Sequence, residues 1–144
     1  MYESYTRQSL PTKRYRELLG SAICVFNSNN ALIVENILKC DDLNKYDWYH
    51  LIDLESGRLK GSVHEVITSK CGDEIETLFS QIIKMRNRII HSYRITNASG
   101  EQTLATKEKT EDGNTQFEIT EGYLLCFIQL NQELSDMLHN LRGY

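Results

Sequence analysis

The sequence predicts an all-α fold, an up-and-down bundle of four to five helices with a small β-hairpin inserted near residues 100–120. Three observations support this prediction. Most apolar residues recur three or four positions apart, which is the spacing of one helix face. The chain has one proline and eight glycines, so long irregular connections are not expected. Only residues 100–120 differ in character, because threonines become frequent there.

The first helix is expected from Pro11 to about Lys39. Pro11 suits a first helical turn, and Ser9 or Thr12 can cap the helix. The polar run at residues 27–30 is the weak point, because asparagine and serine favour turns. The segment therefore forms either one long helix or two stacked pieces.

Two short helices are expected next along the chain. The first can be capped by Asp41 or Asp42. The second starts at Ser62 and Glu65, which have the spacing of a capping box, and stops at Gly72.

The strongest helix signal covers residues 72–95. Asp73 and Glu76 place acids in its first turn, where they complement the helix dipole. Its apolar stripe is formed by Ile75, Leu78, Phe79, Ile82, Ile83, Ile89, Ile90 and Tyr93.

The hairpin and a final helix complete the predicted bundle. Asp112-Gly113 separates two strand-forming segments, 103–107 and 115–119, and this pattern is typical of a hairpin. The last helix follows, with Thr120 as its cap.

The length and the net charge limit the possible number of domains and the possible functions. A chain of 144 residues suits one domain, residues 1–144. The net charge of −4 argues against a protein that coats nucleic acid at large, although residues 84–94 hold four cations and no acid. The first residues lack the apolar stretch of a secretory signal, and no apolar run approaches about 18 residues, so we expect a cytoplasmic protein.

The four cysteines, Cys24, Cys40, Cys71 and Cys126, are scattered and form no Cys-x-x-Cys pair. Three of them lie beside apolar neighbours, so reduced, buried thiols are the favoured interpretation. A disulfide or a zinc site is the less favoured alternative.

Arg86 interrupts the apolar stripe of the strongest predicted helix. At about 100° per residue, Phe79, Ile82 and Ile90 fall within about 40° of Arg86. His91 lies about 140° from Arg86 and about 7.5 Å further along the axis. Because an unpaired buried guanidinium is costly, the stripe must end near Arg86, face a partner acid, or open on a cleft. Position alone slightly favours an arginine paired with a carboxylate of a neighbouring helix.

The residue types Arg86, Asn87 and His91 point instead to phosphodiester chemistry. A histidine titrates near neutral pH and can activate a ribose 2′-hydroxyl. The planar fork of an arginine matches a phosphate and can stabilise charge that grows on a pentavalent phosphorane. Asn87 can orient either group. The sequence has no acidic cluster with metal-ligand spacing, which disfavours a two-metal nuclease.

The stretch RNRIIH, residues 86–91, resembles the Arg-x4-to-6-His signature of the HEPN superfamily. Members of that superfamily often carry a polar residue such as asparagine directly after the arginine. The likeness extends to Tyr93, because RNRIIHSY also fits the Arg-x4-His-x-Tyr form of HepT-type toxins. The position of the motif, late in the major helix of a bundle, is similar as well.

The resemblance implies a HEPN-like helical domain that pairs as a homodimer. In such a dimer, two motifs face each other across a cleft and form a composite, metal-independent ribonuclease site. By position, Arg86 and His91 are then the catalytic pair, and Asn87 supports them. Tyr93 matches a tyrosine that a nucleotidyltransferase antitoxin modifies in HepT-type pairs. The polar hairpin departs from the compact HepT pattern.

We therefore expect a metal-independent endoribonuclease without a cofactor, acting on RNA as a toxin or antiphage effector. Lys84, Arg88 and Arg94 are expected to contact RNA phosphates on the basis of their charge alone. The expected partners are RNA, a second copy of the chain and a cognate antitoxin of nucleotidyltransferase type, with no membrane. The alternative is a non-catalytic HEPN-like module for dimerisation, nucleotide binding or protein interaction. A weaker option is an antitoxin-like partner of another protein.

Overall fold

The computed structural model describes residues 2–142. Its helical elements are η1 (Tyr2–Tyr5), α1 (Lys13–Cys40), α2 (Trp48–Ile52), α3 (Ser56–Val63), the π-helical turn η2 (His64–Thr68), α4 (Ser69–Cys71), α5 (Glu74–Ile90) and α6 (Glu121–Arg142). Between α5 and α6 lie the strands β1 (Tyr93–Thr96), β2 (Gln102–Thr110) and β3 (Gly113–Ile119).

The all-α prediction was wrong, because the chain also forms a three-stranded antiparallel sheet in the order β1-β2-β3. The segment expected to end the strongest helix forms β1 and pairs with β2. Tyr93, Ile95 and Thr96 belong to the aromatic and β-branched types that suit a strand when a pairing partner is present. That partner lies further along the chain, so helical periodicity does not reveal it.

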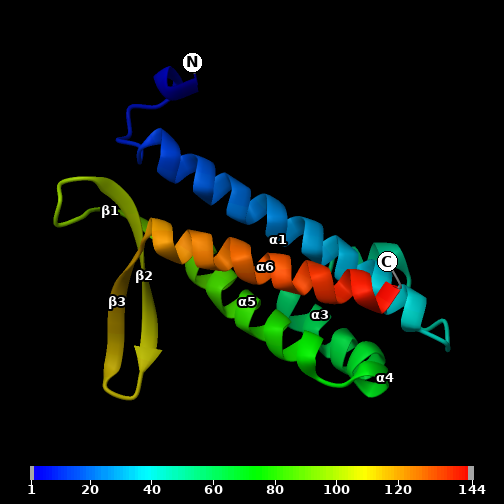
Figure 1. Ribbon diagram of the computed structural model, residues 1–144. Coiled ribbons are helices and arrows are strands. Elements are labelled where there is room, and N and C mark those ends of the chain that lie inside the picture. Colours follow the sequence, from blue (N-terminus) through cyan, green and yellow to red (C-terminus); the bar gives the residue numbers. More distant parts are fainter. Residues whose placement is uncertain (1, 143–144) are drawn as a thin grey trace.

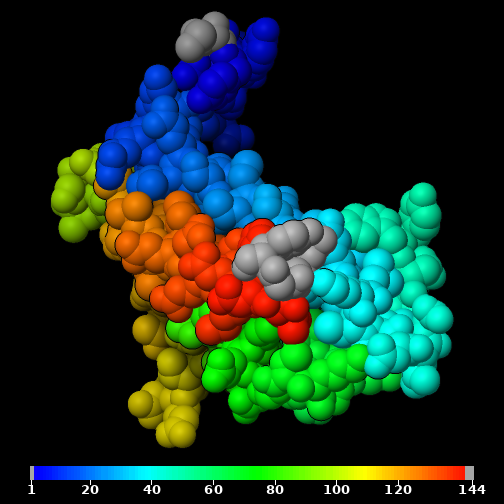
Figure 2. All heavy atoms as spheres, turned by 45° about the vertical axis from the view of Figure 1, so that its right-hand side comes forward, coloured from blue at the N-terminus to red at the C-terminus, as the bar shows by residue number. Residues whose placement is uncertain are grey.

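The three long helices alternate in direction along the chain. Helices α1 and α6 lie side by side and run in the same direction, whereas α5 runs opposite to both (Figure 1). The sheet lies at one end of these helices, where it joins the end of α5 to the start of α6. The tip of the β2–β3 hairpin projects beyond the helices (Figure 2).

The hairpin itself occurs where the sequence predicts it, with longer strands. Thr110 pairs with Gly113, so Glu111 and Asp112 form the turn, one residue earlier than the predicted Asp112-Gly113. Gly113 has a φ of +118°, a backbone conformation that L side chains rarely adopt. The glycine is therefore needed at the first residue of β3 rather than inside the turn.

Helix α1 is one continuous helix despite its polar run. Asn29 is buried, and its amide nitrogen donates to the backbone oxygen and to Oδ1 of Asn131 on α6, at 2.7 and 3.0 Å. Phe26 stacks with Phe127 in the same interface, with ring centroids 6.2 Å apart. Because the buried asparagine is satisfied by α6, it does not compete with the helical backbone.

Tyr15 fastens the sheet to the first turns of α1. Its side chain is buried, and its hydroxyl donates to the backbone oxygen of Ile119 at 2.5 Å. The same hydroxyl accepts from the backbone N–H of Leu104 at 3.2 Å. Burial is the main reason that the pKa of Tyr15 is raised. One side chain thus connects α1 to the ends of β2 and β3.

The predicted caps were partly wrong. Thr12 caps α1, since its hydroxyl accepts from the backbone N–H of Tyr15. Helix α2 is capped by Asp47, and neither Asp41 nor Asp42 has this role.

Helix α3 starts earlier than the sequence predicts. Ser62, the expected cap, is buried inside α3, which begins at Ser56. The chain then continues through η2 and α4 to Gly72, whose φ of +88° ends the helical run. A single longer helical segment therefore replaces the expected second short helix.

The expectation that the cysteines are buried was wrong. Cys24, Cys71 and Cys126 are exposed, Cys40 is half-buried, and all four are free thiols. Neighbours in sequence point to different faces of a helix, so an apolar neighbour does not place a cysteine in the core.

Helix α1 is, by length and composition alone, able to cross a membrane, with a mean hydropathy of 1.2 over its most apolar window. The core helix of a soluble protein meets the same criterion, and the buried residues of α1 contribute to the core here. The cytoplasmic location remains a prediction.

Candidate functional site

The apolar stripe of α5 leaves the core at Arg86. Ile82, one turn earlier, is fully buried, whereas Ile90, one turn later, is 46% exposed. Arg86 between them is half-buried. Helix α5 ends at Ile90, and His91 is its C-terminal cap, with a backbone N–H that donates to the Asn87 carbonyl at 3.0 Å. The interruption of the stripe thus marks the place where the helix reaches the surface.

Arg86, Asn87 and His91 line one cavity of about 520 Å³, which we name the Arg86 cavity. It is formed by α1, by the start of α3 and by the end of α5, through Phe26, Asn27, Asn30, Leu54, Glu55, Ser56, Gly57, Arg86, Asn87, Ile90 and His91. The three residues predicted to act together therefore share one space, and α1 and α3 supply its other walls.

The guanidinium of Arg86 is held by an aromatic ring and an amide. Its Cζ lies 5.5 Å from the centroid of the Phe26 ring on α1, within the range of a cation–π contact. Its Nη1 donates to Oδ1 of Asn87 at 3.4 Å. No ion pair found among residues 2–142 includes Arg86. The position of Arg86 in the sequence favours an ion pair with a carboxylate of a neighbouring helix. No such ion pair is present in the described chain.

Four polar residues of the cavity were missed in the sequence, namely Asn27, Asn30, Glu55 and Ser56. Oδ1 of Asn30 is buried and has no hydrogen-bond partner. A signal did exist, because Asn27 and Asn30 are three residues apart in a helix and so share a face with Phe26. Read only for helix propensity, the polar run indicates a weak point of the helix.

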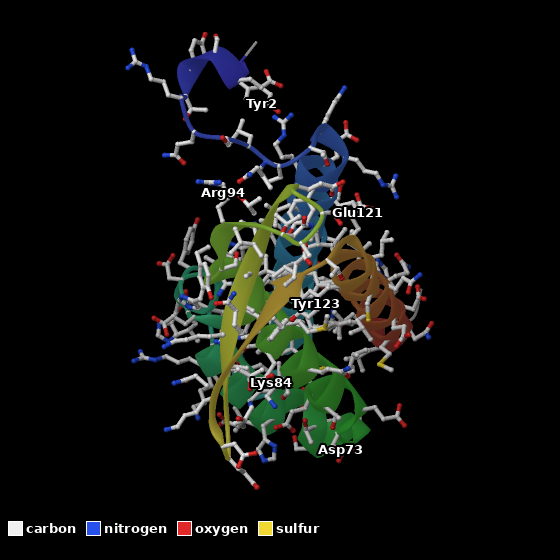
Figure 3. The ribbon with its side chains drawn as sticks, turned by 90° about the vertical axis from the view of Figure 1, so that its left-hand side faces the viewer. Tyr2, Asp73, Lys84, Arg94, Glu121 and Tyr123 are labelled. Carbon is white, nitrogen blue, oxygen red and sulfur yellow. The ribbon has the colours of Figure 1, made fainter. Side chains whose placement is uncertain are left out.

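The other predicted phosphate contacts do not reach the Arg86 cavity. Lys84 and Arg88 lie about 160° from Arg86 around an α-helix, and they line a second cavity against the hairpin. Arg94 lies on β1, donates to Oε1 of Gln102 and lines neither cavity. Figure 3 shows Arg94 and Lys84 in different parts of the molecule. The six residues predicted as catalytic or phosphate-binding are therefore divided among the two cavities and β1.

The sequence predicts Tyr93 in the apolar stripe of the strongest helix, and this prediction was wrong. Tyr93 lies on β1, and the residue is 43% exposed. Its hydroxyl donates to Oε1 of Gln116 on β3 at 2.6 Å. The Arg-x4-His-x-Tyr pattern thus crosses from the end of a helix into a strand.

No protein-family model, curated protein or solved structure matches this chain. The likeness to the HEPN superfamily therefore rests on the residues of the motif themselves. Within residues 2–142, no group of three or more His, Cys, Asp or Glu side chains is placed to hold a metal ion.

Proposed function

We propose that this protein is a metal-independent endoribonuclease of HEPN type, acting as a homodimer with a composite arginine–histidine site. The observation that carries the proposal is the shared cavity of Arg86, Asn87 and His91, in which the guanidinium has no carboxylate partner within the described chain. Glu55 also lines this cavity, but no ion pair within residues 2–142 joins it to Arg86. A half-buried cation without an ion-pair partner is suited to an anionic ligand, because that ligand supplies the missing charge.

The reaction follows from the chemistry of these side chains. His91 accepts the proton of a ribose 2′-hydroxyl, and the 2′-oxygen attacks the adjacent phosphorus. The bond from phosphorus to the 5′-oxygen breaks, and that oxygen takes up a proton from an acid on the opposite side. The products are a 2′,3′-cyclic phosphate and a free 5′-hydroxyl. Arg86 stabilises the charge of the phosphorane, and Asn87 orients the guanidinium through its hydrogen bond.

A second copy of the chain supplies the acid. An in-line displacement needs a base and an acid on opposite sides of the phosphate, and the Arg86 cavity contains one histidine. Ile90, an exposed apolar residue that lines this cavity, is suited to contact between copies. We further propose that the enzyme is a toxin or antiphage effector. A nucleotidyltransferase antitoxin would restrain it through Tyr93, whose ring is exposed.

The test uses purified protein, labelled RNA and excess EDTA. Cleavage should occur without metal and should be lost in Arg86→Ala and in His91→Ala. Arg7→Ala and His50→Ala are matched controls, because both residues are exposed and line neither cavity. The proposal fails if cleavage needs magnesium or survives both substitutions.

One observation favours a second candidate, the non-catalytic dimerisation, nucleotide-binding or protein-interaction module. The contact between Arg86 and the ring of Phe26 stabilises the packing of α1 on α5 without any chemistry. If that is its whole role, Arg86→Ala lowers the melting temperature, wild-type protein never cuts RNA, and its overexpression does not arrest growth.

A further inference from the structure

We propose that the second cavity, between α5 and the β2–β3 hairpin, binds one nucleotide of a single-stranded RNA, next to the phosphate that is cut. We name it the hairpin cavity. This inference rests on the proposed ribonuclease function and adds the position and the strandedness of the substrate. It assigns a role to the hairpin, which the reaction at the Arg86 cavity does not use.

The hairpin cavity has a volume of about 490 Å³. Its lining comes from α5, both strands of the hairpin and the start of α6, namely Gln81, Lys84, Met85, Asn87, Arg88, Glu108, Lys109, Phe117 and Tyr123. Figure 3 shows Lys84 and Tyr123 beside the hairpin, on the side of the molecule that faces the viewer.

Two aromatic rings supply a surface for a base. The rings of Phe117 and Tyr123 are tilted at 47°, with centroids 5.9 Å apart, and both side chains are half-buried. The hydroxyl of Tyr123 donates to the Met85 carbonyl at 3.5 Å. Aromatic side chains stack on any base, because every base has a π-face. Such a site therefore accepts a nucleotide with little sequence preference.

Cations supply the contacts to phosphate. Lys84, Arg88 and Lys109 line the cavity, and Glu108 is the one acid among its lining residues. Arg88 donates to the carbonyl of Lys107 on β2, so the hairpin holds its guanidinium in position. Cations beside half-buried aromatic rings are the combination that binds single-stranded nucleic acid without reading its sequence.

Asn87 connects the two sites, because it lines both the Arg86 cavity and the hairpin cavity. Arg86 and Arg88, on either side of Asn87, face different cavities. A strand that crosses the last turn of α5 thus places one phosphate at Arg86 and a neighbouring nucleotide at Phe117. A duplex cannot do this, since its bases are paired and stacked inside the helix.

The experiment measures RNA binding without cleavage. Protein carrying His91→Ala is titrated against a fluorescent single-stranded RNA and its abasic variants, with one base removed at a time, and anisotropy gives Kd. We expect one abasic position to weaken binding roughly 5- to 150-fold, the range of base–aromatic stacking. The same position should have no further effect when Phe117→Leu is added, because the base has then already lost its ring.

Two further variants at exposed positions test the site without relying on the folding of Phe117→Leu. Lys84→Ala changes an exposed side chain, and it should lower the slope of log Kobs against log salt by about 0.7, the value for one lost phosphate contact on a single strand. Lys13→Ala, also exposed and lining neither cavity, should leave the slope unchanged. Circular dichroism melting curves establish that Phe117→Leu is folded.

The outcomes separate this inference from the ribonuclease proposal. If abasic positions have equal effects with and without Phe117→Leu, or if duplex RNA binds as tightly as single-stranded RNA, the nucleotide site is wrong even when wild type cuts RNA. If the coupling is found but wild type never cuts, the site stands and the ribonuclease proposal falls. Absence of RNA binding overturns both.

Discussion

At the scale of the residue, Arg86 has two contacts that separate its possible roles. The ring of Phe26 requires only a cation over its face. The phosphorane of the proposed reaction benefits from the planar fork of a guanidinium. A lysine at this position keeps the charge and much of the apolar stem. Substitution by lysine therefore removes the geometry needed for catalysis while it preserves most of the packing.

We expect Arg86→Lys to lower the cleavage rate in EDTA by about 10²- to 10³-fold, the usual effect of removing one donor to transition-state charge. The melting temperature should change much less than in Arg86→Ala. Single-turnover cleavage and differential scanning calorimetry measure the two effects. A fully active Arg86→Lys would show that a point charge is enough and that the bidentate role is wrong.

Tyr15 tests the attachment of the sheet. Replacement by phenylalanine removes the hydroxyl that bonds to both Ile119 and Leu104. It leaves the buried carbonyl of Ile119 and the partly buried N–H of Leu104 without this partner. We expect Tyr15→Phe to lose about 1–3 kcal/mol of unfolding free energy in urea. Tyr5→Phe is the control, because Tyr5 is 90% exposed. Equal stability of the two variants would contradict this role of Tyr15.

Tyr123 makes stability depend on alkaline pH. Burial is the main cause that raises the pKa of Tyr123 to about 12, against an ordinary value of 10.0. Because the folded-state pKa is the higher one, this contribution to stability is complete below pH 10 and is lost as the pH rises toward 12.

We expect Tyr123→Phe to flatten the fall in unfolding free energy between pH 10 and 12, as measured by urea titration at several pH values. Part of the fall should remain, since the pKa of Tyr15 is also raised. Tyr49→Phe, at a position 81% exposed, serves as the control. An unchanged profile in Tyr123→Phe would mean that its phenol ionises as readily in the folded as in the unfolded chain.

At the scale of the element, the hairpin depends on the backbone at Gly113. Its φ of +118° is strained for any residue with a side chain, although no atom lies within 4 Å of the added Cβ. We expect Gly113→Ala to cost about 1–2 kcal/mol. Gly20→Ala is the matched control, since Gly20 lies inside α1 with equally open space, and alanine should stabilise that helix by roughly 0.5–1 kcal/mol.

Urea unfolding of the two alanine variants should therefore give shifts of opposite sign. If Gly113→Ala were as stable as wild type, the turn would have to adopt another conformation. The hairpin cavity would then have no fixed wall, and the proposed nucleotide site would lose its structural basis.

At the scale of the whole molecule, the proposed reaction requires two copies of the chain. Sedimentation velocity at micromolar concentration should give a dimer, and the specific activity should fall when the protein is diluted below the dissociation constant of the dimer. A monomer that keeps full specific activity on dilution would contradict the composite site. The measurement does not depend on any substitution.

Local spacing in the sequence was sufficient for several elements. The helical repeats predict three long helices, because each must bury one apolar face. The structure places them at residues 13–40, 74–90 and 121–142, so the second ends five residues before the predicted end. Asp112-Gly113 predicts the hairpin, since few residues tolerate a positive φ. The motif at residues 86–91 also identifies three residues that share one cavity, because their spacing along a helix and its cap places them near one another.

Only the tertiary structure decided what surrounds these elements. Strand β1 depends on pairing with β2, so its residues alone did not distinguish it from a helix end. The ring of Phe26 and the amide of Asn30 reach the Arg86 cavity because α1 packs there, far from the motif in sequence. Lys84 and Arg88 are close to Arg86 along the chain, yet the helix turns them toward the hairpin. Helical periodicity thus determined which residues of α5 share a face, and packing decided which residues each of them contacts.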